Sequence, residues 1–169
     1  MSVPLPHLAP LGLGLAWAVV CDLRRRRIPN VVAASVFVLG LGMRGYDGGL
    51  RALASGLVAA LLLFILFFAA WRAGGIGGGD VKLAAATGAW VGLVGLPWFV
   101  LATLLAGGVV AGFCYLLARA PARAEVRANV IITLLHGELP PVPSHRKGHP
   151  SIPYAVAIAA GAAVALLVV

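Results

Sequence analysis

Two aspartates are the residues in this chain whose type and placement best suit chemistry. Asp22 lies at the end of the first apolar run, and Asp80 directly follows the glycines Gly77, Gly78 and Gly79. Two carboxylates that share one proton can hydrolyse a peptide bond. The ionised carboxylate activates a water molecule while the protonated one donates a hydrogen bond to the scissile carbonyl. Two-aspartate hydrolysis is therefore the first hypothesis for this sequence.

Each aspartate also has a purely structural interpretation. Asp22 could pair with the basic run Arg24 to Arg27, and Asp80 could cap a helix that begins at Val81. The glycine run before Asp80 favours the chemical interpretation, because a simple helix break rarely needs five glycines within six residues. Glycine backbone also permits close approach by a second chain, so we expect that an extended substrate could add to it as a strand.

The other three acidic residues need no catalytic role. Asp47 precedes two glycines and fits a turn, while Glu125 suits the first turn of an interfacial helix and Glu138 lies in a polar loop. Among the acidic residues, Asp22 is therefore the best partner for Asp80.

The composition places these residues in a membrane protein. Of 169 residues, 62% are hydrophobic and 11% charged, and the mean hydropathy is +1.02. A net charge of +8 would suggest a nucleic-acid partner in a soluble protein. Here the basic residues stand between apolar runs, so membrane topology explains them and no nucleic-acid partner is expected.

The apolar runs predict an all-α, polytopic helical bundle that forms a single membrane-embedded domain over residues 1–169. About six transmembrane helices are expected, the second and fourth of them short. Their approximate ranges are Leu5 to Leu23, Pro29 to Met43, Leu50 to Trp71, Val81 to Leu96, Pro97 to Ala118 and Ile152 to Val169. Gly88 with Gly92, and Gly108 with Gly112, have the spacing that lets helices pack closely in lipid.

The distribution of Lys and Arg predicts the orientation. With six spans, the loops after spans one, three and five hold eleven of the thirteen basic residues, and the opposite side holds only Arg44 and Arg51. The positive-inside rule makes the basic face cytoplasmic, so both termini are expected on the non-cytoplasmic side. Asp22 and Asp80 then lie at the same membrane face.

No metal site is expected. Within the predicted cytoplasmic or interfacial loop at about 119–150, His145 and His149 are four residues apart, but Gly148 and Pro150 argue against a regular helix that would aim both at one ion. Cys21 and Cys114 each stand alone in apolar runs and fit buried hydrophobic positions.

Two segments together resemble a known family. The segments CDLRRRRIPN and GGIGGGDVKLAAATGAW, at the ends of spans one and three, resemble the prepilin peptidases of the GxGD aspartic peptidase group. The matching residues are Asp22, Arg27, Pro29, Asn30, Gly77, Gly79, Asp80 and Lys82. With the late segment IPYAVAIAAG, the chain looks like the short form that serves tight-adherence (Flp-type) pili.

This resemblance implies an endopeptidase of the bacterial inner membrane that removes the leader from prepilins at the cytoplasmic face. Asp22 and Asp80 would be the catalytic pair, and Gly77, Gly78, Gly79 and Lys82 would form the substrate-binding loop. Longer relatives carry a cysteine-containing methyltransferase domain that this sequence lacks. The resemblance therefore implies peptidase activity with no cofactor and no methyltransferase activity.

Two alternatives stay open at this level. A non-enzymatic transporter or pilus-assembly scaffold could use the glycines to break a helix and the aspartates to relay protons, although a relay should place its acids near the midplane. The same peptidase chemistry could also act on another leader peptide, such as that of a preflagellin. Lys82 and the basic run could simply fix the orientation of the helices in the membrane. They could also contact substrate or anionic lipid.

Overall fold

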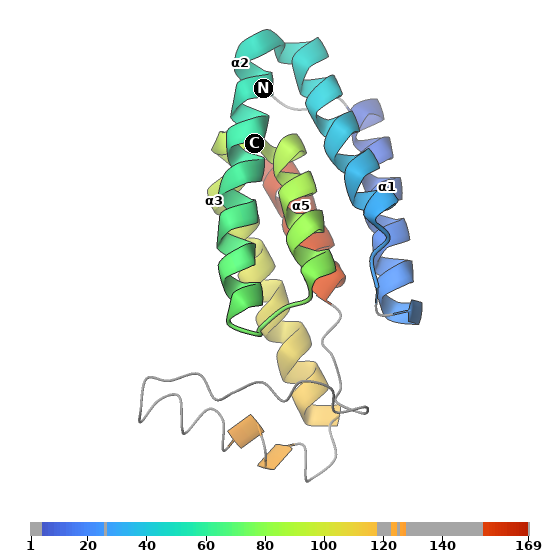
Figure 1. Cartoon of the computed structure of the whole chain (residues 1–169), viewed down its shortest axis with the longest axis vertical. Coiled ribbons are helices and arrows are strands. Elements are labelled where there is room, and N and C mark those ends of the chain that lie inside the picture. The colour runs from blue at the N-terminus through green and yellow to red at the C-terminus, as the bar shows by residue number, and fades with distance from the viewer. Residues whose placement is uncertain (1–4, 26, 118–122, 125, 128–153, 169) are drawn as a thin grey trace.

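The described part of the chain is helical. A computed structural model describes residues 5–25, 27–117, 123–124, 126–127 and 154–168. Its helices are α1 (Leu5–Arg25), α2 (Asn30–Arg72), α3 (Gly78–Leu117) and α5 (Tyr154–Val168), arranged as in Figure 1. Within these residues the all-α prediction is confirmed.

Helices α2 and α3 each bend sharply at one glycine. Gly49 in α2 has φ 63° and Gly92 in α3 has φ 66°, a backbone region that glycine enters at little cost. A straight helix of the 43 residues of α2 would be about 65 Å long, roughly twice the hydrocarbon thickness of a bilayer. Figure 1 shows instead that α2 reverses direction, so that its two arms run antiparallel.

The second and third predicted spans therefore lie on the two arms of α2, and the fourth and fifth lie on α3. The predicted boundary at Pro97 was wrong by five residues, because the bend is at Gly92 and Pro97 lies inside the second arm. The physical reason is that this reversal needs a positive φ, whereas the proline ring holds φ near −65°.

Arg44 ties the two bends together. Its Nε donates to the carbonyl oxygen of Ala52 at 3.2 Å, and its Nη1 donates to that of Trp90 at 2.6 Å. The backbone N–H of Leu93, exposed by the bend in α3, donates to Ser55 Oγ at 3.0 Å. Backbone groups freed by a bend must find such partners where water is scarce.

Helix α3 forms the centre of the bundle, between α2 and α5. Gly88 lies directly against the α2 backbone, where an added Cβ would come within 2.8 Å of Ala60 Cα. On the other side, Gly161 of α5 leaves room for the buried side chain of Thr103. The largest fully buried apolar side chains come from three of the helices and are Phe99, Leu63, Leu83, Ile158 and Val36.

The predicted glycine packing pairs have different outcomes. Gly88 makes the expected close helix contact, but Gly92 forms the bend in α3. Gly108 and Gly112 make no such contact with the described residues, because an added Cβ at either would have no described atom within 4 Å. Four-residue spacing does not indicate which helix face has a neighbour.

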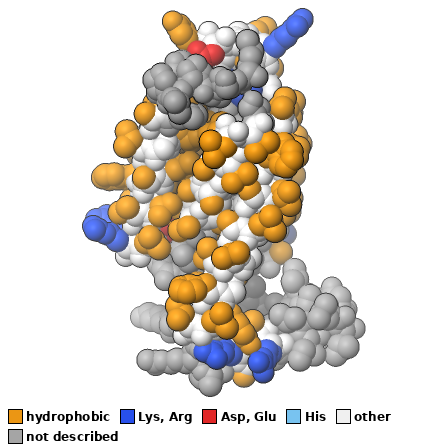
Figure 2. Space-filling model, turned by 180° about the vertical axis from the view of Figure 1, so that it is seen from behind, with side chains coloured by type: hydrophobic (Ala, Val, Ile, Leu, Met, Phe, Trp, Pro, Cys, Tyr) orange, Lys and Arg blue, Asp and Glu red, His pale blue; other side chains and the backbone are white. Residues whose placement is uncertain are grey.

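The outer surface is unusually apolar. Large hydrophobic side chains such as Leu13, Trp17, Val94 and Val109 are more than 60% exposed, and Figure 2 shows hydrophobic side chains along the length of one face. Helices α2 and α3 are each long and apolar enough to cross a membrane, by length and composition. An outward-facing apolar surface of this extent suits a protein that associates with lipid.

Four chain segments meet at one end of the bundle. Figure 1 shows that α1 and α2 end there, while α3 and α5 begin there. The predicted loop at about 119–150, with Glu125, Glu138, His145 and His149, lies outside the described residues apart from positions 123–124 and 126–127. The number of membrane crossings and the side occupied by the termini stay predictions.

Replacing Gly88 with alanine should destabilise the bundle, because the new methyl group would meet the Ala60 backbone. Overpacking of this kind costs about 1–3 kcal/mol. Gly112→Ala is the matched control, since its methyl group has no described neighbour within 4 Å, and we expect unchanged or slightly greater stability. Thermal unfolding in detergent measures both. Equal melting temperatures for the two variants would contradict the observed packing of α3 on α2.

Candidate active site

Asp22 lies in the last turns of α1, at the end of the bundle where the chain segments meet. Its side chain is partly buried, and its Oδ2 atom is fully buried. Arg24 and Arg25, in the last turn of the same helix, are exposed. Their charges suit the carboxyl end of the helix dipole. The helix thus directs the aspartate inward and the arginines outward.

Asp80 lies in the first turn of α3 and is 8% exposed. Its Oδ2 accepts a hydrogen bond from the Gly77 N–H at 3.1 Å, and its own N–H donates to the Gly77 carbonyl at 3.1 Å. Because α3 begins at Gly78, the interpretation of Asp80 as the cap of a helix starting at Val81 was wrong. Asp80 instead reaches back to the N-terminus of its helix, as the acidic member of a capping box does.

The second carboxylate oxygen of Asp80, Oδ1, is buried and accepts no hydrogen bond from any residue that the structure describes. Asp80 is buried, and Asp22 lies near enough for its charge to influence the Asp80 carboxyl group. Two residues 58 positions apart in sequence are thus brought together by the return of α2 to the same end. The structure leaves one oxygen of Asp80 available for chemistry.

Part of the glycine run serves only to end α2. Gly74 has φ 79°, its N–H donates to the Trp71 carbonyl at 2.9 Å, and the Gly75 N–H donates to the Ala70 carbonyl at 3.0 Å. This pair of bonds is a Schellman motif, in which a glycine with positive φ satisfies the last helix carbonyls. These two N–H groups and that of Gly77 are already bonded within the chain, so these three groups are not available to an added strand.

The remaining glycines have different steric roles. An added Cβ at Gly79 would lie 3.2 Å from Ile28 Cβ, and one at Gly77 would lie 3.1 Å from Asp80 Oδ2. At Gly78 the nearest atom, Nε1 of Trp71, would be 3.6 Å away, an ordinary contact. A methyl group would therefore fit tightly at positions 77 and 79, where its neighbour would have to shift by a few tenths of an ångström, and would fit freely at position 78.

The segment between α1 and α2 packs against this glycine turn. Pro29 precedes α2 in extended conformation, with φ −62° and ψ 137°, and Ile28 contacts Gly79. Lys82 Nζ donates to Asn30 Oδ1 at 2.9 Å, which links the second turn of α3 to the first residue of α2. Arg27 is exposed. The two sequence segments that carry the family resemblance are therefore in direct contact.

One aromatic residue near this site lies in the late segment IPYAVAIAAG, for which the resemblance implied no role in the site. Tyr154, the first residue of α5, lies where the Asp80 charge acts on its hydroxyl group. The sequence feature that could have indicated Tyr154 is its position at the start of the last apolar run. This position lies at the same end of the bundle as Asp80. Sequence alone did not specify which face of α5 would be turned inward.

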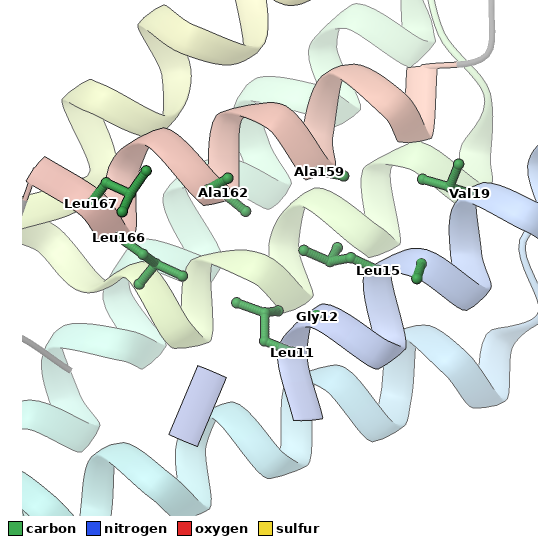
Figure 3. Close-up of a pocket in the computed structure, with 10 residues that line it drawn as sticks. Leu11, Gly12, Leu15, Val19, Ala159, Ala162, Leu166 and Leu167 are labelled. Atoms are coloured by element: carbon green, nitrogen blue, oxygen red, sulfur yellow. The ribbon is translucent and has the colours of Figure 1, made fainter. Parts of the chain in front are cut away.

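A separate cavity of about 480 Å³ lies between α1 and α5 (Figure 3). Its lining is apolar, from Leu11 and Leu15 to Val19 on α1 and from Ala159 to Leu167 on α5. No lining residue has an ionisable side chain, so this cavity offers no group for acid–base chemistry. Among the described residues, no group of three or more His, Cys, Asp or Glu side chains could hold a metal ion.

The structure is an apolar helical bundle that suits association with a membrane, and it has two acids at one end. These features make the protein a candidate intramembrane peptidase. Residues 10–112 match the type IV leader peptidase family, and the chain belongs to this family. The match covers more than half of the sequence and includes Asp22 and Asp80, which confirms the predicted family resemblance. Neither the curated proteins nor the solved structures give a significant match.

Gly79→Ala should lower leader-peptide cleavage by about tenfold or more, because the new methyl group would push Ile28 away from the turn that carries Asp80. Gly75→Ala is the control. Its added Cβ would have its nearest contact at an ordinary 3.5 Å, so its activity should stay within about twofold of the original protein. Rates measured with purified protein in vesicles test this. Equal activity of the two variants would show that the contact between Ile28 and Gly79 does not position the site.

Proposed function

We propose that this protein is an aspartic endopeptidase that removes the leader from Flp-type prepilins, with Asp22 and Asp80 as its catalytic pair. The observation that carries the proposal is the burial of a carboxylate oxygen of each acid, Asp22 Oδ2 and Asp80 Oδ1, where α1 ends and α3 begins. Both are at one end of an apolar bundle, where ionisable groups are costly and are usually retained for function. Membership of the type IV leader peptidase family supports a prepilin-type substrate.

The proposed reaction consumes one water molecule. The ionised aspartate takes a proton from water as the water oxygen attacks the scissile carbonyl carbon, and the protonated aspartate donates a hydrogen bond to the carbonyl oxygen. The resulting tetrahedral intermediate collapses with cleavage of the C–N bond, and a proton passes to the leaving nitrogen. The products are a leader with a new carboxylate and a mature chain with a new amino terminus.

The hydrogen bonding of Asp80 supports this role. Gly77 N–H holds Oδ2 and so fixes the carboxylate plane, while Oδ1 stays free of described protein donors. Such preorganisation avoids the cost of orienting the group during the reaction. No part of this mechanism needs a metal ion or an organic cofactor.

We further propose that the bundle crosses the bacterial inner membrane six times, with the site facing the cytoplasm. The return of α2 at Gly49 and of α3 at Gly92 supplies four antiparallel arms, and α1 and α5 would add two. The basic residues after α1 then lie on the cytoplasmic side, where they favour the anionic lipid surface. A leader peptide would reach the aspartates from that side.

The main rival, a transporter or assembly scaffold that relays protons, needs acids along a path through the membrane. Asp22 near the end of α1 and Asp80 in the first turn of α3 are instead both at one end of the bundle. This placement favours hydrolysis at a membrane surface. Assaying a preflagellin beside a Flp-type prepilin distinguishes the two possible leader substrates.

Asp22→Asn and Asp80→Asn should each abolish cleavage, because an amide can neither accept the water proton nor share the proton of its partner. Loss of one member of a cooperating catalytic unit commonly lowers kcat by about 10⁴-fold or more. The assay follows shortening of a prepilin by the purified protein in vesicles. Asp47→Asn, near the bend at Gly49, should leave the rate unchanged. Full activity of either site variant would end the two-aspartate proposal.

The cleavage rate should show a bell-shaped dependence on pH, since the reaction needs one ionised and one protonated carboxyl group. Addition of a metal chelator should leave the rate unchanged. A pH series of kcat at saturating prepilin, repeated with the chelator, measures both properties. Chelator-sensitive activity that returns with added zinc would contradict aspartate-only hydrolysis.

A further inference from the structure

Tyr154 is held firmly at the first position of α5. Its ring lies edge-on to that of Phe67 of α2, with centroids 6.4 Å apart and an interplanar angle of 78°. On α3, an added Cβ at Gly107 would come within 3.0 Å of the tyrosine hydroxyl oxygen and 3.2 Å of Cζ. The hydroxyl group therefore occupies the space that glycine leaves on the second arm of α3.

The bend of α3 brings this position level with Asp80. Asp80 lies twelve residues before the bend at Gly92, and Gly107 lies fifteen residues after that bend. Asp80 and Gly107 are therefore each about 20 Å from the bend, on antiparallel arms of α3. Figure 1 shows α5 beginning beside the start of α3. Tyr154 is partly buried there and lies near enough to Asp80 for the Asp80 charge to influence its hydroxyl group.

We propose that Tyr154 is a third catalytic residue, whose hydroxyl group donates a hydrogen bond to the carbonyl oxygen of the scissile peptide bond. The inference rests on the proposed peptidase function. As water attacks, negative charge develops on that oxygen, and a fixed donor in apolar surroundings stabilises it strongly. The family match ends at residue 112 and so does not include Tyr154.

The other groups at the site have separate tasks. Asp80 Oδ2 accepts from Gly77, and Lys82 donates to Asn30 on the α2 side of the turn. One aspartate activates water and the other donates one hydrogen bond to the scissile carbonyl oxygen, which can accept a second through its other lone pair. A neutral phenol supplies a hydrogen-bond donor without adding a charge to the site. Packing against Phe67 and Gly107 fixes its direction before substrate binds.

Tyr154→Phe tests this role, because it removes the hydroxyl group and keeps the ring that packs against Phe67. We expect kcat for prepilin cleavage to fall by about 10²-fold, as on loss of one oxyanion donor, with KM within about threefold. The thermal midpoint in detergent should stay unchanged. Tyr46→Phe is the control, since Tyr46 is 86% exposed, and its kcat should equal that of the original protein.

Gly107→Ala provides a second and independent variant. Its methyl group would displace the Tyr154 hydroxyl, so kcat should fall by about tenfold or more in the original protein. In the Tyr154→Phe background the methyl group would still meet the ring, whose Cζ would be 3.2 Å away, but no hydroxyl group remains to be misplaced, so kcat should fall by less than about twofold. Additive losses of kcat would overturn the inference.

The outcomes separate this inference from the proposed function. If the original protein cleaves prepilin and both aspartate variants are inactive, while Tyr154→Phe retains full kcat, the tyrosine role is wrong and the peptidase proposal stands. An increase in KM alone would likewise overturn the catalytic role, because it would indicate ground-state binding. Absence of cleavage by the folded original protein would overturn both proposals.

Discussion

The return of the two long helices at Gly49 and Gly92 is the constraint on which the rest of the structure depends. Each reversal exposes backbone groups that lipid cannot satisfy, and Arg44 and Ser55 bind the exposed groups near the bends. Because α2 and α3 both turn back at the same end of the bundle, the end of α2 and the start of α3 meet at the opposite end of the bundle. That meeting point is where the acids lie.

At the candidate site, local helix hydrogen bonding and the proposed catalytic geometry use the same residues. Asp80 holds the Gly77 N–H and so stabilises the first turn of α3, while its second oxygen stays available. The glycine run divides into two functions. Gly74 and Gly75 end α2, and Gly77 and Gly79 permit close approach around Asp80 and Ile28. The number of glycines reflects two adjacent requirements, helix termination and close packing.

The family and the two acids were accessible from sequence, because motif spacing, apolar runs and the scarcity of carboxylates do not depend on tertiary contacts. The all-α class followed from the same patterns. The bend in α3 was misplaced at Pro97, since only three-dimensional packing shows which residue must adopt a positive φ. Among the described residues Gly108 and Gly112 have no packing partner, since spacing alone does not indicate which helix face has a neighbour.

Sequence by itself thus determined the class of the protein, the peptidase family and the identity of Asp22 and Asp80 as the candidate pair. Tertiary structure decided how they come together: Ile28 packs on Gly79, Lys82 binds Asn30, and Tyr154 is brought beside the site from the far end of the chain. The physical reason is that ionisable side chains and glycines are visible one residue at a time, whereas close contacts depend on which helix faces meet. Those faces are set by where α2 and α3 reverse.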